Sequence, residues 1–209
     1  MARTGRPRAF DRDAALHTAM LVFWERGYAT TSTTDLSAAM GINPPSLYAA
    51  FKNKEHLFRE AIGLYERTEA DASRRAMDEA PTAREAVAAL LHESVDRFTT
   101  EGKPRGCMIV LTATNLTADH ESVRDFALRC RAGTKTTIKT RLDAAVDSGE
   151  LAEGTDTDTI AAFYTTFING LSLQARDGAD RALLHGLVDM AMSVWNTPAG
   201  PLVGVSSAT

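Results

Sequence analysis

Apolar side chains recur every three to four residues along most of this chain, and that spacing restricts its fold more than any other feature. It places the apolar residues on one face of a helix, whereas the alternating β-branched residues typical of strands are nearly absent. Glycine and proline residues divide the pattern into separate segments. We therefore expect the 209 residues to form an all-α protein of helices and loops.

The spacing predicts short helices near the N-terminus and longer ones after them. The first three are expected from Asp11 to Gly27, from Ser32 or Thr33 to Gly41, and from about Pro44 onward. A fourth is expected from Lys54 to about Ala80, where Pro81 would break it. The longer helices are expected over residues 82–100, 119–148, 155–177 and 179–196, and the apolar stretch 107–116 is expected to be buried.

Several classes of protein are disfavoured by what the sequence lacks. No apolar run approaches the ~20 residues of a membrane span, and the N-terminus has no apolar segment typical of a signal peptide. Cys107 and Cys130 do not have zinc-site spacing. The motifs HExxH, GxSxG, GxGxxG and the P-loop are absent, so neither an enzyme nor a bound cofactor or metal is expected. We expect a reduced, cytoplasmic protein with no membrane partner.

Charge is distributed unevenly along the chain. Residues 1–56 contain seven basic and five acidic residues, whereas the rest contains sixteen and twenty-two. Arg3, Arg6 and Arg8 form an N-terminal arm that has no acidic residue. A basic arm before an acidic body indicates local contact with a polyanion, and a solvated, disordered N-terminus is the simpler alternative.

Two adjacent prolines stand at the expected start of the third helix. The first N–H groups of a helix have no partner within it, so proline is tolerated there and its φ already suits a helix. Asn43 is a suitable N-cap before Pro44 and Pro45. Gly41 can take the positive φ of a tight turn between the second and third helices. This order of elements predicts a helix-turn-helix.

A helical projection of the third helix separates two faces. Leu47 and Phe51 fall on the side of the core, whereas Pro45, Ser46 and Ala49 fall on the opposite side. A face with such small side chains can approach the DNA major groove closely and touch thymine methyl groups.

Polar groups around this face suit contacts with DNA. Asn43 and Ser46 can hydrogen-bond to bases or phosphates, and the hydroxyl of Tyr48 suits a phosphate. Lys52 and Lys54 flank the start of the fourth helix, whose N-terminus also favours a phosphate. Each has a simpler role as cap, packing residue or solvated charge, and together they favour DNA.

The stretch STTDLSAAMGINPPSLYAAFKNKEHLF resembles the DNA-binding domain of TetR-family transcriptional regulators. The similarity covers about residues 10–60 and rests on Thr33, Thr34, Gly41, Leu47, Tyr48, Phe51, Lys54, Glu55 and Leu57. The resemblance implies DNA-facing positions at Thr33, Asn43, Pro45, Ser46, Tyr48, Lys52 and Lys54. The family often has a serine or a basic residue where this chain has Asn43-Pro44-Pro45, so base reading by this helix is expected to be sparse. The arginines of the arm could compensate in a narrow minor groove.

The resemblance also implies a homodimer built from the last two helices, which would bind a palindromic double-stranded operator. We expect residues 1–56 to be the DNA-binding domain, 57–197 a regulatory and dimerisation domain, and 198–209 a flexible tail. Burial within one chain is the alternative for the interface residues. The expected interface residues are Phe163, Phe167, Leu171, Leu184, Leu187, Val188, Ala191 and Trp195.

In the family a small molecule binds between the long helices and moves the helix-turn-helix units out of register with DNA. The candidate lining residues here are Phe98, Cys107, Met108, Leu111, Thr112, Phe126, Cys130, Tyr164 and Phe167, for which core packing is the alternative. Cys107 follows Arg105-Gly106 at the start of a helix, where its thiol could be activated or could be buried and inert.

The function expected is therefore that of a ligand-responsive DNA-binding regulator, most simply a repressor released by a small molecule. One alternative is a regulator that senses oxidants or electrophiles through Cys107. Another is a DNA-binding architectural protein with no ligand, which would have no cavity in its body.

Overall fold

The computed structural model describes residues 10–112 and 116–196, and every regular element within these ranges is helical. This confirms the predicted all-α class. The α-helices are α1 (Arg12–Arg26), α2 (Thr33–Met40), α3 (Pro44–Phe51), α4 (Lys54–Thr68), α5 (Asp71–Glu79), α6 (Ala83–Phe98), α7 (Met108–Leu111), α8 (Glu121–Asp147), α9 (Thr157–Arg176) and α10 (Arg181–Ser193). Short 3-10 helices precede α8 (Ala118–His120) and follow α10 (Val194–Asn196). Among the described helices, none combines the length and apolar character needed to cross a membrane.

Local hydrogen bonds set the starts of the short helices where the sequence predicts them. The carboxylate of Asp11 accepts the N–H groups of Asp13 and Ala14 at the start of α1. Ser32 and Asp35 cap α2 reciprocally. Each of these bonds joins residues two or three positions apart, which is why the sequence alone reveals them.

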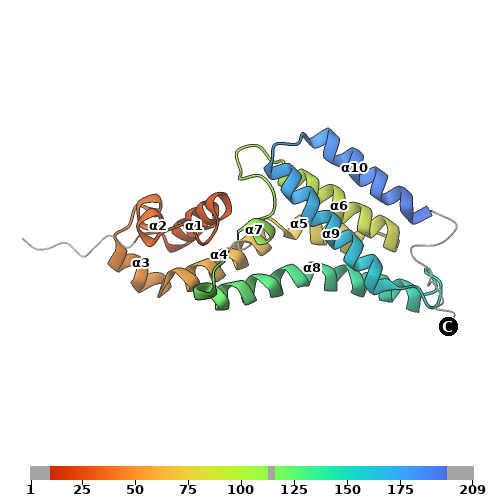
Figure 1. Cartoon of the computed structure of the whole chain (residues 1–209), viewed down its shortest axis with the longest axis horizontal. Coiled ribbons are helices and arrows are strands. Elements are labelled where there is room, and N and C mark those ends of the chain that lie inside the picture. Colours follow the sequence, from red (N-terminus) through yellow and green to blue (C-terminus); the bar gives the residue numbers. More distant parts are fainter. Residues whose placement is uncertain (1–9, 113–115, 197–209) are drawn as a thin grey trace, which may run out of the picture.

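The helices α1, α2 and α3 pack around one apolar core at the end of an elongated molecule (Figure 1). Leu36 from α2 and Leu47 from α3 are fully buried against the apolar face of α1. Gly41 joins α2 to α3 with a φ of 66°, the left-handed conformation that the turn requires. The buried side chains of this core are Leu16, Met20, Phe23, Leu36, Leu47 and Phe51.

The fourth helix ends earlier than the sequence predicts, and the expected helix from Lys54 to Ala80 is wrong. The chain turns at Glu69 and Ala70, whose N–H groups both bond to the carbonyl of Tyr65. The turn itself has no glycine or proline, and the buried positions Ser73 and Met77 continue the helical spacing of the buried face of α4. The periodicity therefore conceals the turn, which allows α5 to pack against α6.

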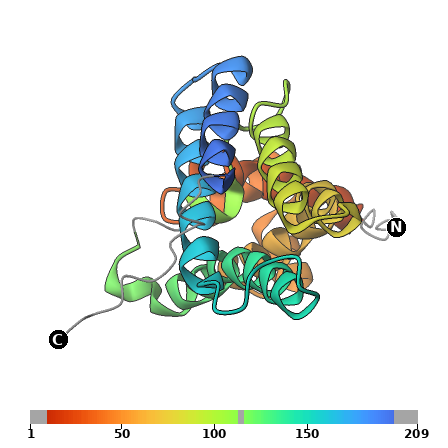
Figure 2. The same cartoon turned by 90° about the vertical axis from the view of Figure 1, so that its right-hand side faces the viewer.

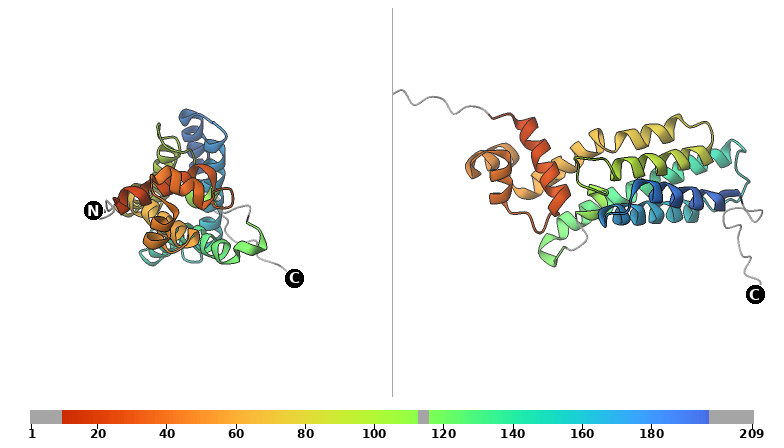
Figure 3. Two further views of the ribbon diagram at one scale, coloured as in Figure 1. Left: turned by 90° about the vertical axis from the view of Figure 1, so that its left-hand side faces the viewer. Right: turned by 90° about the horizontal axis from the view of Figure 1, so that it is seen from above.

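The longer helices surround α6, which contacts α5, α8, α9 and α10. Seen along the long axis, α9 and α10 lie on one side, α5 and α6 on another, and α8 below them (Figure 2). The view from above shows these helices extending away from the N-terminal bundle, with α4 between the two parts (Figure 3). Of the stretch 107–116 expected to be buried, Cys107, Met108 and Thr112 are buried, residues 109–111 and 116 are partly buried, and residues 113–115 lie outside the described ranges.

Hydrogen bonds and ring contacts join the N-terminal bundle to the longer helices, and three of them involve buried groups or backbone. The indole N–H of Trp24 donates to the carbonyl of Gly106 at 3.0 Å. The backbone N–H of Tyr28 donates to the carbonyl of Thr112, also at 3.0 Å. The ring of Trp24 also meets the ring of Tyr65 edge to face, with centroids 4.9 Å apart. All these groups lie in or against the shared core, so the two parts are packed as one body.

Gly106 is irreplaceable at this joint for two reasons. Its φ is 81°, and an added Cβ would lie 2.6 Å from the Ser172 carbonyl oxygen and 2.6 Å from Cδ1 of Leu111. We expect Gly106→Ala to lower the free energy of unfolding, measured by urea denaturation, by about 3 kcal/mol.

Gly102→Ala is the matched control, because Gly102 has a φ of 75° but, apart from its chain neighbours, no described residue has an atom within 4 Å of the added Cβ. It should lower the free energy of unfolding by only about 1 kcal/mol, the effect of the backbone conformation alone. Equal losses for the two variants would show that the close approach at Gly106 is unimportant.

Candidate functional site

The start of α3 is built as the sequence predicts. The side-chain oxygen of Asn43 accepts the backbone N–H of Ser46 at 2.9 Å. Pro44 and Pro45 occupy the first two helical positions and have no N–H that would need a partner. Proline and the cap thus hold the start of a helix of only eight residues, which would be marginal by propensity alone.

The outward face of α3 carries small and polar side chains. Leu47 and Phe51 are fully buried, whereas Pro45 and Ala49 are exposed and Ser46 is half-buried. The Tyr48 side chain is 47% exposed, so its hydroxyl can reach a partner outside the chain. This surface can enter a groove closely and offers few hydrogen-bonding groups for base readout.

The remaining residues predicted to face DNA have different surroundings. Asn43 and Lys52 are exposed, and Thr33 is half-buried at the start of α2. The amine of Lys54 lies over the ring of Tyr28, 4.2 Å from its centroid, and burial lowers the pKa of this amine. Lys54 thus also packs the bundle together, a role that the sequence did not reveal. Arg3, Arg6 and Arg8 lie outside the described residues.

Lys52 closes α3 in a strained backbone conformation. Its φ is 64° and its ψ is −61°, and it is the one non-glycine residue with positive φ in the described part of the chain. The N–H of Asn53 donates across it to the carbonyl of Phe51 at 2.7 Å, which makes a γ-turn. The turn brings Asn53 to the N-cap of α4, where its side chain accepts the N–H of His56. Strain of this kind is typical of functional sites.

The first turns of α4 are tied to α8 by a polar cluster that sequence reasoning missed. The guanidinium of Arg59 donates to Glu55 at 2.8 Å and to the Ser122 hydroxyl at 2.8 Å, and it stacks on the ring of Phe126 at 4.5 Å. The Ser122 hydroxyl in turn donates to Glu55 at 2.7 Å. This bond and the Arg59 guanidinium hold the pKa of Glu55 below its usual value. The spacing of Glu55 and Arg59 indicates a helical ion pair. The sequence does not indicate that Ser122, 63 residues after Arg59, is their partner.

A cavity of about 290 Å³ lies among α4, α5, α6, α7, α8 and α9. Of the residues predicted to line it, Phe98, Cys107 and Cys130 do so. Its other walls include polar residues that the apolar spacing could not reveal, such as Tyr65 and Arg97. The predicted residues that lie outside the lining are Met108, Leu111, Thr112, Phe126, Tyr164 and Phe167.

The misplaced candidates have packing roles instead. Met108 is buried, and Thr112 is buried where its carbonyl meets the N-terminal bundle. Phe126 lies beneath Arg59, away from the lining. The ring of Tyr164 packs edge to face on Phe163 at 5.0 Å. Apolar spacing marks buried residues, and most buried residues belong to the core rather than to a cavity wall.

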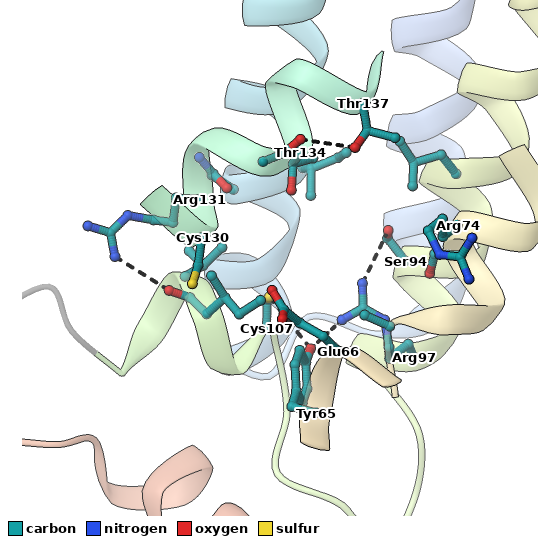
Figure 4. A pocket seen from close by; sticks show the side chains of 18 of the residues that line it. Tyr65, Glu66, Arg74, Ser94, Arg97, Cys107, Cys130, Arg131, Thr134 and Thr137 are labelled. Atoms are coloured by element: carbon teal, nitrogen blue, oxygen red, sulfur yellow. Dashed lines mark hydrogen bonds between the residues drawn. The ribbon is translucent and has the colours of Figure 1, made fainter. Parts of the chain in front are cut away.

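Tyr65, Arg97 and Cys107 meet on one side of the cavity, with Thr134 and Thr137 across from them (Figure 4). The hydroxyl of Tyr65 donates to the sulfur of Cys107 at 3.5 Å and accepts a hydrogen bond from Arg97. Complete burial raises the pKa of Tyr65 well above its usual value, so it stays a neutral donor. Cys130 also lines the cavity, and burial raises the pKa of its thiol.

The helices α9 and α10 expose apolar side chains, but only some of those predicted for a dimer interface. Leu171, Leu184, Val188 and Ala191 are buried within their own chain, so the prediction for these four needs correction. Phe163 is exposed, and Phe167, Leu187 and Trp195 are partly exposed. Further exposed apolar side chains are Leu173, Leu183, Met190 and Val194. The helical spacing identified the apolar positions but could not separate the inner face from the outer one.

Comparisons with known proteins agree on the family and the fold. Residues 15–61 match the family model described as "Bacterial regulatory proteins, tetR family", and residues 83–189 match "Tetracyclin repressor-like, C-terminal domain". The chain is 33% identical over 192 residues to the HTH-type transcriptional repressor ComR of Escherichia coli (strain K12), covering 91% of each protein. It is 29% identical over 174 residues to the repressor BdcR of the same organism, covering 83% of each.

Among solved structures, the chain is similar to a cysteine mutant of the TetR family transcriptional regulator CifR, complexed with 26-bp double-strand operator DNA. The two share 46% sequence identity and a TM-score of 0.88, and the match covers 91% of this chain and 100% of CifR.

The strain at Lys52 can be measured directly. Lys52→Gly should raise the free energy of unfolding by about 1 kcal/mol, because glycine adopts positive φ without a steric penalty. Lys52→Ala is the matched control, since it removes the same charge but keeps a Cβ. Urea denaturation that finds Lys52→Gly no more stable than Lys52→Ala would contradict a strained turn.

Proposed function

The chain belongs to the TetR family of bacterial regulatory proteins, and from that premise we propose that it is a dimeric repressor of transcription. It binds a palindromic operator through its N-terminal helices, and a small molecule in the cavity releases it. The family is one of transcriptional regulators rather than enzymes. We place the protein in the bacterial cytoplasm, where its DNA lies.

The observation that carries the DNA-binding role is the outward face of α3. It is held at its start by the Asn43 cap and two prolines, and it presents small side chains and the exposed Tyr48 to a groove. The similarity to CifR, whose structure contains operator DNA, supports the same use of α3 here. Because Pro45 leaves few hydrogen-bonding groups on the face, α3 docks the protein on DNA as much as it reads bases.

The exposed apolar side chains on α9 and α10 support the proposed dimer. Exposed apolar side chains gathered on two adjacent helices are typical of a surface that a partner covers. Two copies related by a two-fold axis would present two α3 helices to successive major grooves, about 34 Å apart. We propose Phe163, Leu183, Leu187 and Met190 as members of this interface.

The position of α4 supports release by a ligand. Its last turn supplies Tyr65 to the cavity, and its first turn follows α3 directly. Arg59 ties the same helix to α8, which forms another wall of the cavity. A ligand that displaces Tyr65 or α8 would therefore shift α4 and change the separation of the two α3 helices. Coupling of about 1–3 kcal/mol is typical of such linked sites.

A covalent signal at Cys107 is the second candidate for release. Its sulfur lines the cavity and touches the Tyr65 hydroxyl, so an adduct there would disturb the same contact as a bound ligand. Mass spectrometry of effector-treated protein would distinguish a thiol adduct from reversible binding. A ligand-independent architectural protein is disfavoured, because the body contains a cavity.

Selection from a pool of random DNA duplexes tests the proposal as a whole. At about 0.15 M salt, the purified protein should enrich an inverted repeat whose half-sites are one or more helical turns apart. A pool with no enriched inverted repeat after several rounds would refute operator binding by a two-fold dimer.

Asn43 offers a sharper test of which surface faces DNA. Asn43→Asp keeps a capping oxygen, so the free energy of unfolding should change by less than about 0.5 kcal/mol. The added negative charge would face the phosphates, and we expect operator affinity, measured by fluorescence anisotropy, to fall by at least about 10-fold.

Asn43→Ser is the control, because serine also caps a helix but adds no charge. Equal operator affinity for Asn43→Asp and Asn43→Ser would show that the start of α3 does not lie near DNA.

A further inference from the structure

We propose that the cavity binds a small organic anion, a carboxylic acid with a short apolar body, and that Arg97 receives its carboxylate. This assignment rests on the proposed function for its regulatory meaning, since the anion would be the effector. The binding itself needs no DNA and can be tested without it.

Arg97 is a cation without an anionic partner. It donates to the hydroxyl of Tyr65 and, at 3.5 Å, to that of Ser94, both of which are neutral. Its Nε is buried and has no hydrogen-bond partner among the described residues. In the same part of the chain, no carboxylate forms an ion pair with Arg97. An arginine keeps its charge at any ordinary pH, so this arrangement leaves a positive charge and a free donor at the wall of a cavity.

The neighbouring acids are engaged elsewhere. Asp96, next to Arg97 in sequence, pairs with Arg181 at 2.6 Å and with His185 at 2.7 Å. Asp71 and Asp78 pair with Arg74, another lining residue, and so neutralise it. The intrachain ion pairs thus leave Arg97 unmatched.

The lining contains one acid and a third arginine among its described residues. The acid is Glu66, which forms no ion pair within the described ranges. Burial raises the pKa of this carboxyl above its usual value. Arg131 also forms no ion pair within the described ranges, but it donates to the carbonyl of Ile109 at 3.4 Å and its guanidinium points away from the cavity (Figure 4). Of the described lining arginines, Arg97 is therefore the one whose unpaired charge faces the cavity, which favours an anionic ligand.

The size and other walls of the cavity restrict the anion further. A volume of about 290 Å³ lies at the lower end of small-molecule sites and suits a ligand of few atoms rather than a nucleotide-sized one. Leu90, Phe98 and Ile168 supply apolar walls for a short aliphatic or aromatic body. Within the described ranges, the buried hydroxyl of Ser73 has no hydrogen-bond partner and can receive a polar group of the ligand.

A purely structural role is the alternative for Arg97. Its guanidinium lies 4.7 Å from the ring centroid of Phe98 and 5.7 Å from that of Tyr65. These contacts compensate part of the charge but do not supply a partner for Nε. A structural arginine would make the protein stable without making it prefer anions, so ligand preference separates the two roles.

Three ligands of equal chain length provide the test: hexanoate, hexanamide and hexylamine. Titration calorimetry of the full chain without DNA should show hexanoate binding at least about 10-fold more tightly than hexanamide, because a charge-assisted bond exceeds a neutral one. Hexylamine should bind more weakly still. Arg97→Gln should remove the preference for hexanoate, whereas Glu66→Gln, its matched control in the same lining, should keep it.

Two results would overturn the assignment. One is a preference for hexylamine that Glu66→Gln removes, which would make Glu66 the recognising group. The other is no binding of hexanoate at any soluble concentration. If Arg97→Gln does not fold, as judged by circular dichroism, Arg97→Lys keeps the charge and should keep a weakened preference for hexanoate; equal affinity for hexanoate and hexanamide in that variant would contradict the proposal.

Release of the selected operator by hexanoate is a separate measurement. If hexanoate binds in a manner that depends on Arg97 but does not release the operator, the anion site is supported and the effector role is refuted. Failure to select any operator would leave the calorimetric result intact.

Discussion

The contact on which the structure most depends is the one between Trp24 and the segment that begins at Gly106. The indole donates to the Gly106 carbonyl and its ring packs against Tyr65, so one side chain joins α1, α4 and the entrance to α7. A carbonyl buried without a partner is destabilising, and this bond satisfies it. Only a glycine fits at the receiving position, because Ser172 and Leu111 lie where a Cβ would stand. The N-terminal bundle is therefore not a loosely tethered module.

This joint gives α4 its two roles. Tyr65 faces both Trp24 and the cavity, and the other end of the same helix begins immediately after the strained turn at Lys52. Arg59 fixes the first half of α4 to α8 through Ser122. Because α4 is held by packed contacts at both ends, a displacement at the cavity would move the whole helix and thus α3. The mechanism of release that we propose depends on this rigidity.

Local chemistry explains how much of this could be predicted from the sequence. The helix starts at Asp11, Ser32, Asn43 and Asn53 were predictable because each cap joins residues two or three positions apart. The turn at Glu69 was not, because the apolar spacing continues through it and packing against α6 decides the outcome. The family resemblance and the outward face of α3 were predictable in the same way, because the residues that determine them lie in one contiguous stretch.

The walls of the cavity were harder to predict, since apolar spacing selects core residues and misses polar ones. In the sequence, Arg97 looks like an ordinary charged residue on a helix. It is left unpaired because the neighbouring Asp96 pairs with Arg181, which is distant in sequence. The interface candidates failed in a related way: Leu184 and Val188 carry the correct character but face their own chain. Sequence patterns report that a residue is apolar, whereas the direction in which it points depends on partners distant in sequence.

The division of labour around the cavity also bears on how such a regulator diverges. The joint between the N-terminal bundle and the longer helices is made by Trp24, Gly106 and Tyr65. The opposite wall of the cavity is formed by Gly133, Thr134 and Thr137, on a largely exposed face of α8. Substitutions on that wall disturb little packing and should be tolerated by the fold. Under the mechanism we propose, duplicated copies of such a gene can therefore diverge toward new ligands while operator binding and its coupling to the cavity stay unchanged.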